Sequence, residues 1–316
     1  MLTSLHLFFL FMAFSQFVLG IWGNGFLGLI HCIHWIKRSK ISLPDFIIMN
    51  QAFSRIFLQC AVIFDGVTLV LYSYFYYGMT VSQISETSWS FSNYLTTWLS
   101  TCLSVFYCLK TAIFSHPAFL WLKWRTFQVV ACILLTCELF FCFNTVLLIR
   151  KLDIYSGLLK MILTANYTEN VRRKERELYV FHLPSLLWTV IPFILSLFSC
   201  FLLTLSLRRH TRMMGHQVTA SRDVSTKAHV RATIVKISFS LLFLFHFVFI
   251  LIRTASMFLP DAKVISMITL LAAPLSPSVH TFILILQSKI LKQAFLRLLW
   301  LKKDSMKAGV RASLTH

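Results

Sequence analysis

Seven long apolar stretches dominate this 316-residue chain and limit what it can fold into. A helix needs about 20 mostly apolar residues to cross the hydrocarbon core of a bilayer. The stretches that reach this length predict an all-α membrane protein, a seven-transmembrane helix bundle. The predicted spans are Leu5–Ile36, Pro44–Leu71, Ser85–Ile113, Phe127–Ile149, His182–Leu207, Thr233–Phe258 and Val264–Leu286.

The composition excludes several classes of protein. Hydrophobic residues make up 57% of the chain and charged residues only 13%, whereas soluble domains carry about 25% charged residues. The net charge of +19 comes from short basic runs between the apolar stretches, which favours anionic membrane lipid over nucleic acid as a partner. The eight cysteines lie inside apolar stretches without metal-site or disulfide spacing. We therefore predict no metal and no cofactor.

The basic residues also predict an orientation, because short cytoplasmic loops are enriched in Lys and Arg. The segments after predicted spans 1, 3, 5 and 7 are all basic, so these segments and the C-terminus are expected in the cytoplasm. The N-terminus is then extracellular in a multi-pass protein of the plasma membrane. Asn166 begins an Asn-Tyr-Thr glycosylation motif in the predicted outer loop between residues 150 and 180.

The chain divides at the end of the seventh span. Residues 1–287 form the predicted transmembrane domain, and residues 288–316 form a cytoplasmic amphipathic helix and a short tail. Within Ser288–Lys303, basic residues alternate with Ile, Leu, Phe and Trp. This pattern is typical of a helix that lies in the inner membrane interface.

Polar residues inside predicted spans are costly and usually face the interior of a helix bundle. Arg55 in the second span needs partners, and Asn24 in the first span together with backbone carbonyls can supply them. A structural hydrogen-bond cluster and a part in activation both remain open for these two residues and for His280. The other polar groups inside spans are Asp65, Glu138, His246 and Arg253.

Enzyme motifs are missing from the sequence. It holds no HExxH, no GxSxG and no carboxylate pair at a workable spacing, so we predict that the protein is not an enzyme. A transporter is the alternative from a different class. Transporters tend to show two similar halves with broken helices at matching positions, and the seven spans show no such pairing.

Several motifs together resemble the type 2 taste receptors, the bitter taste family of G-protein-coupled receptors. The resemblance covers nearly the whole chain, and the inner loop after the third span is its most specific part. Vomeronasal pheromone receptors are the nearest alternative, but we would not expect that loop in them. The motifs are Gly23-Asn24-Gly25-Phe26, Phe53-Ser54-Arg55, Leu103-Ser104-Val105-Phe106-Tyr107-Cys108-Leu109-Lys110, Phe114-Ser115-His116-Pro117, Phe119-Leu120-Trp121-Leu122-Lys123-Trp124-Arg125, Ile191-Pro192-Phe193 and His280-Thr281-Phe282.

The resemblance implies a receptor that binds small bitter organic compounds in an outward-facing cavity of the bundle and activates a gustducin-like heterotrimeric G protein. It assigns Trp89 and Asn93, one helical turn apart, to the wall of this cavity; anchoring in the membrane interface is the alternative for Trp89. Basic and aromatic residues of the inner loops would face the G protein, with attraction to inner-leaflet lipid as the alternative. These residues are Tyr107, Lys110, His116, Lys123, Arg125, His210 and Arg212.

The chain departs from the family pattern at a few positions. The family usually has Ser where Thr281 stands and an aromatic hydroxyl where Phe243 stands. Ile234 replaces a basic residue, and Gln287 begins a segment that the family commonly reads Gly-Asn-Ser-Lys. These four positions bear on G-protein coupling and on the range of agonists.

Overall fold

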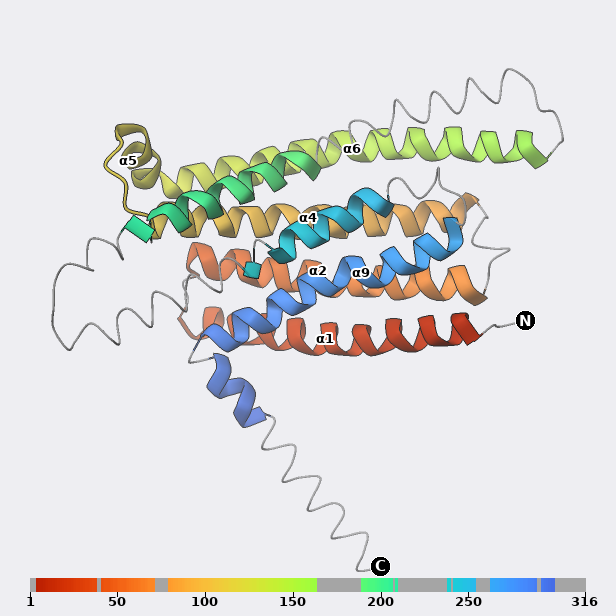
Figure 1. The fold of residues 1–316 in the computed structure, drawn as a ribbon, viewed down its shortest axis with the longest axis horizontal. Coiled ribbons are helices and arrows are strands. Elements are labelled where there is room, and N and C mark those ends of the chain that lie inside the picture. The colour runs from red at the N-terminus through yellow and green to blue at the C-terminus, as the bar shows by residue number, and fades with distance from the viewer. Residues whose placement is uncertain are drawn as a thin grey trace, which may run out of the picture.

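The computed structural model describes residues 4–38, 41–71, 79–163, 189–206, 208–209, 238–239, 241–253, 262–288 and 291–298. Every regular element within these ranges is a helix (Figure 1). The helices are α1 (Ser4–Arg38), α2 (Leu43–Leu71), α4 (Met79–Thr111), α5 (Pro117–Trp124), α6 (Thr126–Leu163), Thr189–Ser206, Leu241–Arg253, α9 (Ala262–Gln287) and residues 291–298.

Five of the described helices are long and apolar enough to cross a membrane: α1, α2, the first part of α6, Thr189–Ser206 and most of α9. Leu241–Arg253 is a shorter apolar helix. Large hydrophobic side chains such as Phe8, Phe11 and Phe14 are more than half exposed on α1. Exposed phenyl rings in such number suit contact with lipid tails, and the prediction of an all-α membrane protein is confirmed.

The helices lie side by side, with α4 between α2 and α6 (Figure 1). α2 packs on α1 and α4, α6 packs on α4, and α9 packs on α1 and α2. α4 is rich in Ser and Thr, and hydroxyls such as those of Ser92 and Thr97 donate to the carbonyl oxygen four residues earlier. This bond satisfies a hydroxyl inside the bundle without a partner from another helix.

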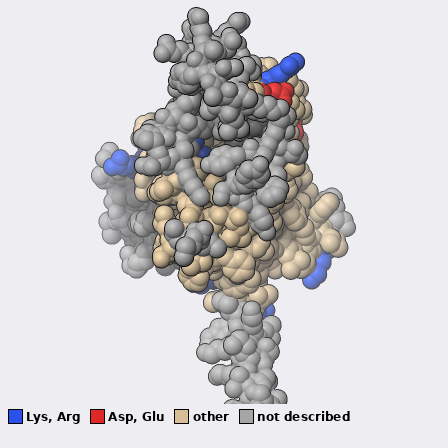
Figure 2. Space-filling model, turned by 90° about the vertical axis from the view of Figure 1, so that its right-hand side faces the viewer, with Lys and Arg blue, Asp and Glu red and all other residues tan. Residues whose placement is uncertain are grey.

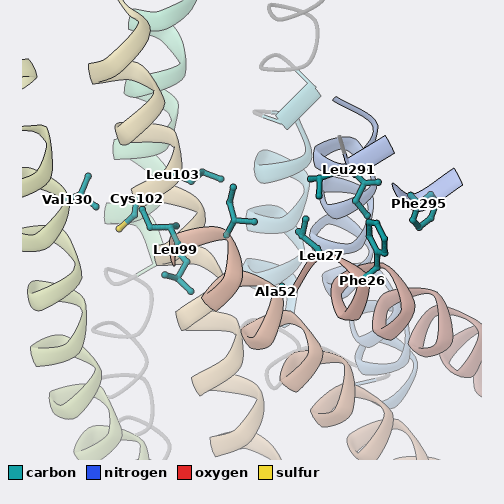
Figure 3. Packing of buried hydrophobic residues seen from close by; sticks show 12 residues of the cluster. Phe26, Leu27, Ala52, Leu99, Cys102, Leu103, Val130, Leu291 and Phe295 are labelled. Carbon is teal, nitrogen blue, oxygen red and sulfur yellow. The ribbon is translucent and has the colours of Figure 1, made fainter. Parts of the chain in front are cut away.

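An apolar cluster joins α1, α2, α4 and α6 to the helix at residues 291–298 (Figure 3). The ring of Phe295 lies 4.7 Å from Trp22 and 5.1 Å from Phe26, measured between ring centroids. The Ser288 hydroxyl accepts a hydrogen bond from the Leu291 N–H at 3.3 Å and so caps the start of this helix. The last described helix is therefore fixed to α1 by aromatic packing.

The structure corrects the predicted boundaries in two places. The fourth span was expected to end at Ile149, but α6 continues to Leu163. Arg150 and Lys151 mark where the apolar stretch ends, and a helix does not have to stop there because its backbone bonds are internal. The third span was expected to start at Ser85, whereas α4 begins at Met79.

The inner loop after α4 also differs from the expectation, because it contains the short helix α5. His116 occupies the N-cap position and Pro117 begins the helix, an arrangement favoured because proline lacks an N–H that the first turn would leave unpaired. Phe119 is the buried residue of α5 and packs on Phe114 at 5.1 Å between centroids. α5 is thereby fixed to the end of the bundle where α4 ends.

Candidate functional site

A buried arginine lies at the centre of a polar network that joins three helices. Arg55 on α2 is 2% exposed. Its Nη1 donates to Thr281 Oγ1 at 2.7 Å, and its Nη2 donates to His280 Nδ1 at 2.6 Å. The Thr281 hydroxyl donates in turn to Asn24 Oδ1 at 2.7 Å. Side chains from α1, α2 and α9 are thus linked through one guanidinium.

The network includes the predicted residues Asn24, Arg55 and His280, with different contacts from those expected. Asn24 reaches Arg55 through the Thr281 hydroxyl, and no backbone carbonyl bond to the guanidinium is found in the described part of the chain. Within that part no carboxylate lies at ion-pair distance from Arg55. A buried cation held by neutral groups alone depends on every one of its hydrogen bonds.

Further hydrogen bonds between side chains extend the network towards α4. Gln59 Nε2 donates to Ser278 Oγ at 2.8 Å, and Gln51 Nε2 donates to Ser100 Oγ at 2.5 Å. The Ser54 and Thr96 hydroxyls lie 2.7 Å apart. Polar contacts therefore join α2 to both α4 and α9 along the middle of the bundle.

A small cavity adjoins this network. It has room for about one water molecule. His246 lines it and places Nδ1 2.9 Å from the Ala273 carbonyl oxygen, so Nδ1 carries the proton in this contact. The lining residues come from α2, α4, α9, the helix Leu241–Arg253 and Phe239 just before it. They are Arg55, Thr96, Thr97, Ser100, Phe239, Leu242, Phe243, His246, Ser276, Pro277 and His280.

Trp89 and Asn93 lie on α4 at the spacing that puts them on one face with the cavity-lining Thr97. Trp89 is 6% and Asn93 7% exposed. Trp89 Nε1 and Asn93 Oδ1 have no hydrogen-bond partner among the described residues. An indole donor and an amide acceptor therefore remain available on this face, outward of the cavity.

An ion pair lies against Trp89. Asp65 on α2 accepts a hydrogen bond from Arg253 Nη2 at 3.2 Å and one from Ser85 Oγ at 2.6 Å. The Arg253 guanidinium carbon lies 4.5 Å from the centroid of the Trp89 ring, within the range of a cation–π contact. α2, α4 and Leu241–Arg253 thus meet at this point. Asp65 and Arg253 were both expected inside spans, but their pairing was not predicted.

Five of the residues predicted to face a G protein lie at the C-terminal end of α4 and around α5. Lys110 is exposed and Tyr107 is half-buried. His116 Nδ1 accepts from the Ala118 N–H at 3.3 Å and caps α5. Lys123 Nζ donates to the Ala112 carbonyl oxygen at 3.0 Å. Two of these side chains therefore also fix the fold of the loop.

Arg125 follows α5, and its guanidinium carbon lies 4.9 Å from the centroid of the Trp121 ring. Trp121 is 56% and Trp124 89% exposed, so α5 presents aromatic surface next to basic side chains. His210, Arg212 and Ile234 lie outside the described residues, as does the glycosylation motif at Asn166.

A second acidic contact near the inner end was missed by the sequence reasoning. Asp45 Oδ1 lies 3.3 Å from His31 Nδ1, and the Ser42 hydroxyl accepts a hydrogen bond from the Asp45 N–H at 3.3 Å. The Ser-x-x-Asp spacing at the start of α2 resembles a capping box and could have predicted the hydrogen bond between Ser42 and Asp45. Glu138, another polar residue within a span, is exposed on α6.

Comparison with known proteins identifies the family. The model of the family "Taste receptor protein (TAS2R)" matches residues 1–303. Taste receptor type 2 member 3 of Papio hamadryas is 42% identical over 306 residues, which cover 97% of both chains. The human member 3 is 41% identical over the same share, and member 7 of Pongo pygmaeus is 40% identical over 92% of both chains.

These matches extend over nearly the whole chain. They decide against the vomeronasal and transporter alternatives, because the relatives that match end to end are named as taste receptors. The chain therefore belongs to the type 2 taste receptor family, which makes it a bitter taste receptor of the G-protein-coupled class and not an enzyme.

Proposed function

We propose that the receptor crosses the plasma membrane seven times, with residues 1–287 as the receptor domain and residues 288–316 as a cytoplasmic helix and tail. The five apolar helices, α4 and Leu241–Arg253 supply seven spans. The exposed Lys37, Lys110 and Arg125 lie at or near the ends of α1, α4 and α5 that are joined by the inner loops. This charge distribution supports a cytoplasmic inner end and an extracellular N-terminus.

The face of α4 that carries Trp89 and Asn93 is the proposed agonist site. The observation that supports it is the pair of buried groups without partners, Trp89 Nε1 and Asn93 Oδ1. Buried polar groups nearly always have hydrogen-bond partners. Of the nine buried side-chain atoms that lack one in the described residues, these two lie one helical turn apart on one face of α4, which supports a ligand or water there. A small organic agonist would accept from the indole, donate to the amide oxygen and stack on the ring.

Agonist binding would shift the population of bundle conformations towards one that activates a gustducin-like G protein. Binding achieves this only if the agonist contacts the active bundle better than the resting one. The Arg55 network adjoins the cavity and reaches α1 and α9 through Thr281. It is therefore the physical connection between the agonist site and the inner half.

The G protein would meet the inner loops. The surface around α5 combines the exposed Trp121 and Trp124 with Lys110 and Arg125. Aromatic and Arg side chains are enriched at the centres of protein interfaces. Tyr107, His116, Lys123, His210 and Arg212 complete the proposed contact set, and Asn166 is the proposed glycosylation site.

The test is calcium release in cells that express the receptor with a gustducin-type chimeric G protein, screened against bitter compounds. Trp89→Phe removes the indole N–H and keeps an aromatic ring, and Asn93→Leu removes the amide. Trp98→Phe is the matched control, because about 3.6 residues per turn place Trp98 on the opposite face of α4. Surface expression is measured for every variant.

The expected result is a response of the wild type that Trp89→Phe and Asn93→Leu weaken by about tenfold or more in half-maximal concentration, as for a lost buried hydrogen bond. Trp98→Phe should respond like the wild type at equal surface expression. An equal loss in all three variants would mean that general packing of α4, and not agonist contact, explains the effect.

A further inference from the structure

The position of Arg253 suggests a ligand chemistry for the proposed agonist site. Its guanidinium lies between the carboxylate of Asp65, at 3.2 Å, and the ring of Trp89, at 4.5 Å from the guanidinium carbon to the centroid. The carboxylate side chain is 1% exposed and that of Arg253 is 10% exposed. The receptor's own cation therefore occupies a place formed by a buried anion and an aromatic face.

Asp65 and Trp89 together form a recognition site for a cation of suitable size. A buried carboxylate is strongly disfavoured unless a positive group or several donors face it. Ser85 supplies one donor at 2.6 Å, and Arg253 supplies the positive charge. The face of an indole attracts cations more strongly than that of any other aromatic side chain. Neither feature is specific for a guanidinium on the same chain.

We propose that this receptor preferentially binds organic cations, with a protonated amine, a guanidinium or a quaternary ammonium group on an apolar body. The ligand's cation replaces the Arg253 guanidinium between Asp65 and Trp89. This inference rests on the proposed agonist site at Trp89. It adds two residues to those that determine specificity. Asp65 is the anion that selects a positively charged ligand, and Arg253 is the internal cation that the ligand displaces.

The exchange keeps the charges balanced. Asp65 stays paired throughout, because one cation leaves as another arrives, and the Ser85 hydrogen bond need not change. Arg253 is the last described residue of Leu241–Arg253, and its long side chain can move its charged group away from Asp65. A neutral ligand in the same place would leave the buried Asp65 carboxylate without a cation and with the Ser85 hydroxyl as its remaining donor among the described residues.

Displacement also removes a connection between helices. The ion pair joins α2 to Leu241–Arg253, and the cation–π contact joins the same helix to α4. A bound cation would release Leu241–Arg253 from both neighbours at this point. This helix also carries His246, which lines the inner cavity beside Arg55. The exchange thus offers a physical route from cation binding to the Arg55 network.

The experiment uses two isosteric probes, an aryl trimethylammonium compound and its neutral tert-butyl analogue. Binding to the purified full-length receptor is measured by the shift in melting temperature, and calcium release is measured in cells. The variants are Asp65→Asn, Arg253→Gln and, as the matched control that keeps a cation, Arg253→Lys. The double variant Asp65→Asn with Arg253→Gln removes both charges, so neither is left buried without its partner. It replaces a single variant that fails to fold.

The wild type should bind the cationic probe at least about tenfold more tightly than the neutral one, as expected for a cation–π contact combined with a carboxylate. Asp65→Asn and the double variant should lose that preference. Arg253→Gln should bind the cation about tenfold more tightly than the wild type, because the competitor is gone. Arg253→Lys should stay close to the wild type.

Equal binding of the two probes by the wild type would overturn the inference, as would a cation preference that survives in Asp65→Asn. Neutral bitter compounds are tested in the same cells to separate this outcome from failure of the agonist site itself. If neutral compounds activate the wild type through Trp89 and the cation has no advantage, the site stands and its proposed charge selectivity falls.

Discussion

Replacing Thr281 by Val removes one hydroxyl from the middle of the buried network and keeps the shape of the side chain. Thr281 Oγ1 accepts from Arg55 Nη1 and donates to Asn24 Oδ1, each at 2.7 Å. Thr281 is 0% exposed, so water does not reach this position in its place. The valine variant leaves a guanidinium N–H and an amide oxygen buried without these partners.

The size of the effect follows from the two lost contacts. A hydrogen bond to a charged group contributes about 1.5–3 kcal/mol. Neutral side-chain hydrogen bonds between membrane helices average about 0.6 kcal/mol. Together they predict a loss of about 2–4 kcal/mol in the free energy of unfolding. For a chain of this size the melting temperature should fall by roughly 4–8 °C.

The thiols of the receptor itself can report the melting. The thiols of Cys102 and Cys200 are buried, whereas those of Cys60, Cys132 and Cys142 are exposed. A thiol-reactive fluorescent dye therefore labels the exposed thiols from the start and the buried ones only when the bundle opens. The detergent-purified receptor is heated with the dye, and the midpoints of the wild type and the variants are compared. Thr281→Ser is the matched control, because it keeps the hydroxyl and loses one methyl group, which costs about 1 kcal/mol.

The serine control decides how the result is interpreted. Thr281→Ser should melt within a few degrees of the wild type and clearly above Thr281→Val. Serine is also the residue that the family resemblance gives for this position. Equal melting of the two variants, or a valine variant that melts like the wild type, would refute the bridging role of the hydroxyl between Arg55 and Asn24.

Three further changes test other contacts. Phe295→Ala should release the helix at residues 291–298 from α1 and speed its cleavage in limited proteolysis, because a buried phenyl ring contributes about 3–5 kcal/mol. His116→Ala should weaken α5 by about 1 kcal/mol and lower agonist-stimulated nucleotide exchange, whereas His116→Asn should restore the cap. Gly20→Ala places a Cβ 2.6 Å from Gln59 Nε2, so it should lower the melting temperature, while Gly25→Ala, with no atom within 4 Å, should not.

The length of the apolar stretches predicted the membrane spans, and the cost of polar groups in lipid predicted which residues face the bundle interior. The expected second span ended at Leu71, where α2 ends, because the change in composition marks the membrane boundary. Arg55, Asn24 and His280 were singled out as polar groups inside spans, and they share one network. Polar groups inside spans usually face the bundle interior, so the sequence indicates candidates for such a cluster, although Glu138 is exposed and Asp65 and Arg253 pair elsewhere.

The partners within the clusters were not predictable, because they depend on which helices become neighbours. Arg253 and Asp65 lie far apart in the sequence, and only the packing of Leu241–Arg253 beside α2 and α4 brings them together. Thr281 was noted as a departure from the family, but its bridge to Asn24 requires α9 to lie against α1. α5 had a local signal in the His116–Pro117 pair, which the apolar pattern of the loop concealed.

The hydroxyl-rich composition of α4 has a consequence for the biosynthesis of the receptor. Unlike α2, α4 does not reach the apolarity of a helix that enters lipid alone, and in the folded bundle its hydroxyls are covered by neighbouring helices. During synthesis those neighbours are incomplete, because Thr189–Ser206 and Leu241–Arg253 follow α4 in the chain. We therefore expect α4 to depend on its packing against α2, which precedes it in the chain, until these later helices emerge.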